Sequence, residues 1–180
     1  MTLANIIRRS LIELGRGTDA QSTNAWQEKL TMFANDAVQD LVEYLELRKT
    51  DKVTAQDNVI KLGDLSSECI KVVEVRQGDK PIVFETADAS DEIRVKAEGE
   101  VDVEYRYAPK EMKDDVAKPD IPEYLQRLIV SYVVYREHLT ADPTMQRRAD
   151  AFYRLYEEGK RKASKTRGEA DTYKIYNNGW

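Results

Sequence analysis

The chain of 180 residues is poor in the side chains that most enzymes use for catalysis. It contains a single histidine, His138, and a single cysteine, Cys69. One histidine cannot form a two-histidine zinc site, and a catalytic triad would have to use His138 without any supporting local motif. One cysteine also excludes an intrachain disulfide. We interpret His138 as a half-exposed residue near a helix end and Cys69 as a small buried side chain on a strand. We therefore expect no catalytic residue, no metal site and no cofactor.

The sequence also lacks long apolar runs and an excess of positive charge. No run approaches the ~18 apolar residues of a membrane helix, and the first residues do not form a signal-peptide pattern. We expect a protein that is neither exported nor bound to a membrane. The net charge of −5 argues against nonspecific binding to DNA or to anionic lipid. With 41% hydrophobic and 34% charged residues, the chain is expected to fold with a strongly solvated surface.

Apolar residues recur at intervals of three and four near both ends of the chain, which predicts amphipathic helices. The first predicted helix covers residues 3–14 and the second covers 26–48. Two more are expected over 121–139 and 145–156, the last one stopping at Gly159. Leu128 is expected to lie in the core of the third of these helices.

The middle of the chain changes to a period of two. Val101, Val103, Tyr105 and Tyr107 alternate with charged residues, as in a strand with one buried face. Shorter strand candidates precede them, separated by glycine-containing turns. We predict a small antiparallel β subdomain over 51–109.

The order of helices, strands and helices predicts an α+β fold. We expect residues 1–50 and 110–164 to form one helical bundle, because the stripes at 26–47 and 121–139 are too apolar to remain in water. Two independent domains are the alternative.

The C-terminal residues combine a basic run with aromatic side chains that follow neither a helical nor a strand period. We predict an extended C-terminal arm over 165–180. Free tails are normally poor in groups that need burial, so the arm is expected to dock on a partner, the alternative being that it folds back on its own bundle. The candidate partner-binding residues are Lys160, Arg161, Lys162, Tyr173, Ile175, Tyr176 and Trp180.

Several local segments, in this order, resemble the head-to-tail adaptor (connector) proteins of tailed bacteriophages. The similarity covers roughly residues 20–165. The segments are Ala25–Leu30, Leu65–Val75, Tyr105–Pro109, Asp120–Glu123, the break at Thr140–Pro143, and Phe152-Tyr153.

The resemblance implies a helical bundle with an inserted β domain and a structural, non-enzymatic role. It implies a homo-oligomeric, dodecameric ring beneath the portal protein that binds a downstream tail protein and surrounds a channel for DNA. The arm over 160–180 would then embrace the portal. The implied location is the neck of the virion, after synthesis in the host cytoplasm.

Two other classes of function remain open from the residues alone. An acidic regulatory or nucleic-acid-associated module could use the basic residues 160–167 as its contact. A small hydrolase could use a carboxylate pair such as Asp114-Asp115 or Glu157-Glu158, although adjacent carboxylates usually point apart into solvent.

Overall fold

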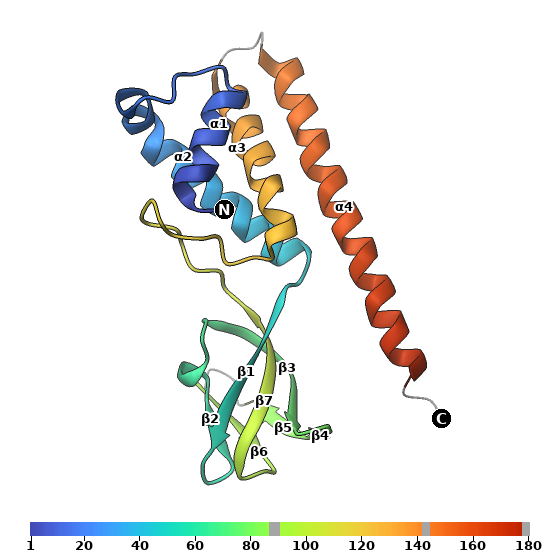
Figure 1. Cartoon of the computed structure of the whole chain (residues 1–180). Coiled ribbons are helices and arrows are strands. Elements are labelled where there is room, and N and C mark those ends of the chain that lie inside the picture. Colours follow the sequence, from blue (N-terminus) through green and yellow to red (C-terminus); the bar gives the residue numbers. More distant parts are fainter. Residues whose placement is uncertain (87–90, 142–144, 178–180) are drawn as a thin grey trace. The chain divides into compact units, whose positions relative to one another are not determined.

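The computed structural model describes residues 1–86, 91–141 and 145–177, with side chains for 1–86, 91–139 and 145–165 (Figure 1). The chain forms two compact units. A helical unit contains residues 1–45 and the chain from Lys110 onward, and a β unit contains Glu46–Pro109. Helices and antiparallel strands are both present, so the predicted α+β fold class is confirmed.

The helical unit is built from segments that are far apart in the sequence. Its helices are α1 (Leu3–Glu13), α2 (Ala20–Tyr44), α3 (Gln126–Ala141) and α4 (Gln146–Asn177). Thr2 caps α1 and Asp19 caps α2, each accepting a hydrogen bond from a backbone N–H of the first turn. Gly15 follows α1 with a φ of 67°, a conformation that favours glycine after a helix. Figure 1 shows α4 running alongside α3 and continuing past its end.

The core of the helical unit is formed by the apolar stripes of these helices. Ile6 and Leu11 of α1, Leu30 of α2, and Ile129 and Val133 of α3 are completely buried. Burial of such stripes supplies most of the stability of a helix in water.

Two residues of the α3 stripe do not lie where the sequence predicted. Leu128 is only half-buried, and Leu139 is 54% exposed. The buried face of α3 is instead carried by Ile129 and Val133, and it continues the spacing of four from Leu125, which is buried in the 3-10 turn just before the helix. Residues three or four apart share one face of a helix, so apolar residues at other spacings lie at the edge of the buried stripe.

The prediction of an extended arm after a helix stop at Gly159 was wrong for residues 165–177, which continue α4. The run from Lys160 to Ala170 consists mainly of Lys, Arg, Glu, Ala and Ser, most of which favour a helix. Gly159 has a packing role, because a Cβ at this position would overlap the side chain of Leu128 on α3. Trp180 lies outside the described residues.

The β unit consists of two antiparallel sheets. One has the strand order β1-β7-β3-β4 and the other β2-β6-β5. The strands are β1 (Arg48–Ala55), β2 (Val59–Lys61), β3 (Cys69–Gln77), β4 (Lys80–Ile82), β5 (Phe84–Thr86), β6 (Glu92–Val95) and β7 (Gly99–Tyr107). β1 begins earlier than the apolar pattern indicates, because Arg48 already pairs with Arg106 on β7.

The alternating residues of β7 are buried, as their period of two predicts. Tyr105 is completely buried, and its hydroxyl donates a hydrogen bond of 2.6 Å to Asp51 on β1. Asp51 also accepts a bond from the backbone N–H of Ser66. Burial and the bond to Asp51 raise the pKa of Tyr105. This pair fixes the register of β1 against β7.

Candidate interaction surfaces

Lys160 is the first of the predicted partner-binding residues, and it is buried inside the helical unit. It is 5% exposed. Its Nζ lies 2.8 Å from Oδ2 of Asp40 on α2 and 3.3 Å from Oε1 of Glu157. Tyr156 donates a hydrogen bond to the same oxygen of Asp40. The ammonium also lies 4.3 Å from the centre of the Tyr44 ring. The structure therefore corrects this assignment, because Lys160 joins α4 to α2 instead of facing a partner.

The charges around Lys160 and Tyr156 are consistent with a structural contact. Burial by itself would lower the pKa of Lys160, but the hydrogen bond and charge of Asp40 and those of Glu157 outweigh it and the pKa is raised. Burial and Asp40 raise the pKa of Tyr156, so its hydroxyl stays a donor. Both groups keep the protonation state that their bonds to Asp40 require.

The other predicted partner-binding residues lie farther along the chain. Arg161 and Lys162 are exposed on α4. Tyr173, Ile175 and Tyr176 belong to the helical part of the chain, but their side chains lie outside the described residues. The spacing Ala149, Tyr156, Lys160 on α4 is helical, so the burial of Lys160 could have been inferred from the sequence.

Glu137 is the most buried carboxylate of the helical unit and joins three segments. It is almost completely buried on α3. Its Oε1 lies 2.7 Å from Arg16, and its Oε2 lies 2.6 Å from Lys29 on α2. The guanidinium of Arg16 stacks 3.5 Å from the centre of the Trp26 ring. Two cations compensate the buried charge, which would otherwise be costly.

His138, beside this cluster, is buried and not half-exposed as predicted. It lies 6.2 Å from the Phe152 ring, centre to centre, and its Nε2 has no hydrogen-bond partner among the described residues. Burial and the charge of Arg148 lower its pKa, and Glu137 offsets this only in part. His138 is therefore a neutral core residue at pH 7.

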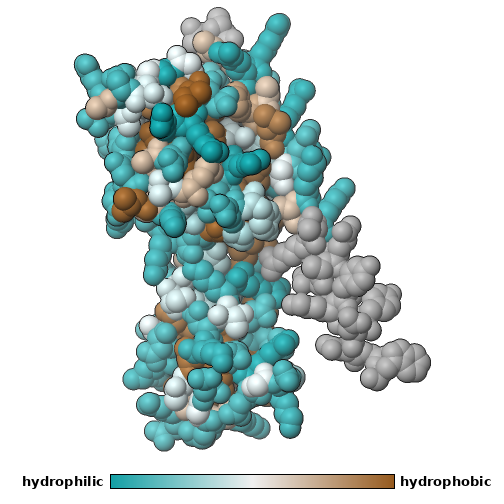
Figure 2. All heavy atoms as spheres, in the orientation of Figure 1, coloured by the Kyte–Doolittle hydropathy of each residue, from teal (hydrophilic) through white to brown (hydrophobic). Residues whose placement is uncertain are grey.

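An open groove of about 540 Å³ lies between α1, α3 and α4. Its apolar lining consists of Ile12, Val130, Phe152 and Leu155. Ile12 is 58% exposed and Leu155 is 56% exposed. Figure 2 shows brown apolar side chains exposed among teal polar ones on the visible face of the helical unit. An exposed apolar groove of this kind is typical of an interaction surface.

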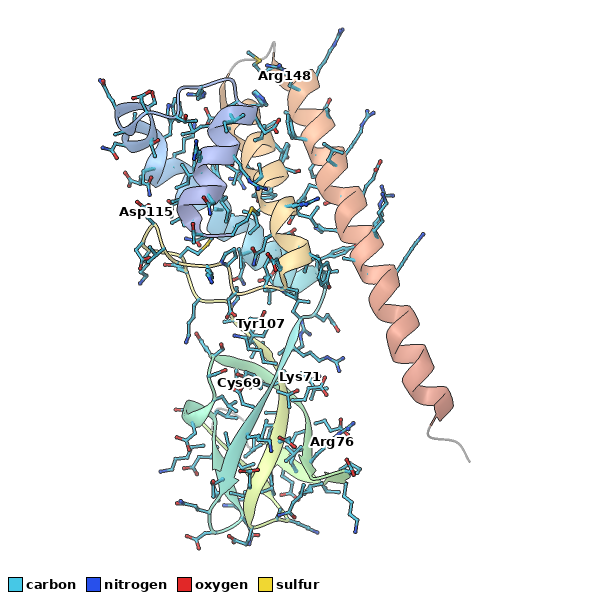
Figure 3. The ribbon with its side chains drawn as sticks, in the orientation of Figure 1. Cys69, Lys71, Arg76, Tyr107, Asp115 and Arg148 are labelled. Carbon is cyan, nitrogen blue, oxygen red and sulfur yellow. The ribbon has the colours of Figure 1, made fainter. Side chains whose placement is uncertain are left out.

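A second exposed apolar group lies on the turn that precedes α3. Val116 is 78% exposed, more than any other large hydrophobic residue in the described part of the chain. It follows Asp114 and Asp115. Figure 3 places Asp115 on the side of the helical unit opposite to α4.

No arrangement of the described side chains suggests catalysis. Cys69 belongs to the β unit and His138 to the helical unit. Burial raises the pKa of the Cys69 thiol, which makes it a weaker nucleophile. Among residues 1–86, 91–139 and 145–165, no group of three or more ligand-type side chains could hold a metal ion.

Comparison with known families identifies the chain. The family model described as SU10 adaptor protein matches residues 1–176. The chain belongs to the SU10 adaptor protein family. No curated protein matches the chain.

Membership in the adaptor family agrees with the resemblance to phage head-to-tail adaptors, and it implies a structural phage protein rather than an enzyme. An adaptor of this class is implied to contact portal and tail proteins in the neck of the virion. None of the helices in the described ranges has both the length and the apolar character to cross a bilayer.

Proposed function

We propose that this adaptor is the subunit of a dodecameric ring that joins the portal protein to the downstream tail protein and forms part of the DNA channel. The observation that carries the proposal is the match to the adaptor family over residues 1–176, which is nearly the whole chain. The family model covers both units, so the β unit belongs to the adaptor itself.

Features of the chain support assembly into a ring. A ring subunit needs apolar and aromatic surface beyond its own core, and the chain has ten tyrosines and two exposed apolar sites on its helical unit. The net charge of −5 suits a conduit, because a strongly basic lining would hold DNA through counterion release.

The C-terminal half of α4 is proposed to bind the portal. α4 has 32 residues, or about 48 Å, whereas α3 has 16 residues, or about 24 Å. Helix α3 therefore cannot cover the second half of α4. Arg161, Lys162 and the aromatic residues at 173–180 would provide this contact, and Lys160 is excluded because the bundle uses it.

A serine scan of the C-terminus tests the portal contact. We compare a variant that replaces the four apolar residues with one that replaces their polar neighbours. The first carries Tyr173→Ser, Ile175→Ser, Tyr176→Ser and Trp180→Ser, and the second carries Thr172→Ser, Lys174→Ser, Asn177→Ser and Asn178→Ser.

We expect both variants to melt like the wild type, and only the first to lose co-sedimentation with purified portal rings. A deletion of residues 169–180 should behave like the first variant. Normal portal binding by the deletion would refute the proposal, and so would unfolding of the deleted monomer, since the segment would then belong to the subunit's own core.

Electron microscopy of the adaptor mixed with its portal tests the ring itself. The expected particle carries twelve adaptors in one ring beside the portal. Isolated rings should not retain duplex DNA at moderate salt, whereas tight salt-sensitive retention would indicate a nucleic-acid-binding role instead.

A further inference from the structure

The acidic turn before α3 is held rigidly, although its tip is exposed. Oδ1 of Asp114 accepts hydrogen bonds from the backbone N–H groups of Val116, at 3.1 Å, and Ala117, at 2.8 Å. Oδ1 of Asp115 accepts a bond of 2.6 Å from Gln27 on α2. These bonds fix the turn before any partner binds, which lowers the entropy cost of association.

The backbone on both sides of the turn is tied to the bundle. The N–H groups of Leu3 and Ala4 donate to the carbonyls of Ala117 and Asp115, at 2.8 and 3.1 Å. Upstream, Met112 is buried and its backbone exchanges two hydrogen bonds with the side chain of Asn35. The turn therefore presents Val116, which is 78% exposed, in a defined position at the surface of the helical unit.

The groove between α1, α3 and α4 has complementary chemistry. Arg9 and Arg127 stand beside its apolar lining. In the described part of the chain, neither guanidinium has a carboxylate within ion-pair distance. Each surface also carries one charge opposite in sign to its main charge. This charge is Glu13 in the basic groove and Lys113 just before the acidic turn.

The two surfaces belong to different sides of the helical unit. Asp115 lies on the side of the helical unit away from α4, and α4 supplies one wall of the groove (Figure 3). A contact between two different surfaces of identical subunits is heterologous, and its repetition closes into a ring when the rotation fits.

We propose that the turn Asp114–Val116 of one subunit inserts into the α1/α3/α4 groove of a second copy. Val116 contacts Ile12 and Leu155 of the neighbour, and the aspartates face Arg9 and Arg127. This inference rests on the proposed ring and names the surfaces that build it. The charged contacts at the rim select the orientation, and the apolar contact supplies most of the affinity.

Disulfide cross-linking in a Cys69→Ser background tests the pairing. Val116→Cys and Leu155→Cys are both at exposed positions, so the fold tolerates them. An oxidised equimolar mixture of the two single variants should give linked dimers, and a chain that carries both cysteines should give a ladder up to the full ring. Val116→Cys mixed with Met32→Cys, at an exposed position of α2 outside the groove, is the matched control and should give no dimer.

A complementation assay provides a second readout. Val116→Asp alone and Leu155→Asp alone should remain monomeric with or without portal rings. Their mixture should stop at dimers, because each variant keeps one intact surface. The cross-links and the complementation are measured on the adaptor alone at high concentration and again with purified portal.

The outcomes separate this inference from the proposed function. If rings form on the portal but neither aspartate variant affects them and no 116–155 link appears, the ring stands and this contact is wrong. If Val116→Cys instead forms a disulfide-linked dimer with itself, the two turns contact each other. This result would overturn the proposed contact between turn and groove. If no oligomer forms in any condition, the ring and this contact both fail.

Discussion

Replacement of Lys160 by alanine separates a structural from a partner-binding role for this residue. The hydrogen bond between its ammonium and Asp40 would be worth ~1.5–3 kcal/mol to a charged partner in a buried site. The Asp40 side chain is 42% exposed, so solvent screening reduces this to about 1 kcal/mol. Loss of the aliphatic stem, which is buried with the rest of the side chain, adds about 1–2 kcal/mol.

Lys160→Ala is therefore expected to lower the free energy of unfolding by about 2–3 kcal/mol. For a chain of this size, such a loss lowers Tm by roughly 4–12 °C. Lys160→Met keeps most of the stem and removes only the charge, so it should cost about 1 kcal/mol or less. Arg161→Ala and Lys165→Ala, at exposed neighbouring positions, should stay within ~0.5 kcal/mol of the wild type.

Urea and thermal unfolding followed by circular dichroism measure these differences, and portal co-sedimentation is measured on the same proteins. If Lys160→Ala is as stable as Arg161→Ala and yet loses portal binding, the burial of Lys160 is irrelevant to the fold and the reasoning fails. If Lys160→Met is as damaging as Lys160→Ala, packing of the stem contributes nothing.

Gly159→Ala should destabilise the helical unit by ~1–2 kcal/mol in urea unfolding, because the added Cβ overlaps the side chain of Leu128. In a Leu128→Ala background the same change should be neutral or stabilising, and equal effects in both backgrounds would contradict the close approach of α3 to Gly159. Stability should fall as the pH drops below about 6.5, because burial lowers the pKa of His138 and the unfolded chain then binds more protons, with a slope of at most ~1.4 kcal/mol per pH unit. His138→Gln should remove this dependence around and just below pH 6.5, and an unchanged profile would assign it to another group. Tyr105→Phe should cost the β unit ~1–2 kcal/mol in urea unfolding, because it removes the donor to Asp51; an unchanged midpoint would show that this bond adds nothing.

The sequence predicts the elements whose buried face follows a simple period. The stripe of α1 and the alternation in β7 are both observed, and both follow from a single buried face. The sequence does not predict the end of α4, because a glycine after an apolar helical stripe usually marks a helix stop. In the structure, the missing Cβ of Gly159 lets α3 pack close to α4. The helix continues past this glycine because most of the residues that follow it have a high helix propensity.

The surfaces are harder to predict because they depend on residues brought together from distant segments. Arg9, Val130 and Leu155 meet in one groove only when α1, α3 and α4 pack. The basic run at 160–162 illustrates the opposite error, since a lysine inside a charged stretch looks solvated. Only its position on the Tyr156 face of α4 distinguishes Lys160 from Arg161.

The pairing of Arg48 with Arg106 places the entrance and the exit of the β unit on adjacent strands. Neighbouring strands are about 5 Å apart, a gap that a short hairpin turn spans. The unit can therefore be exchanged for a loop, or for a different domain with close termini, without stretching the helical unit. Sequence changes between Arg48 and Arg106 can therefore alter which partner the β unit contacts. The sequence of the helical unit stays constrained by its own packing.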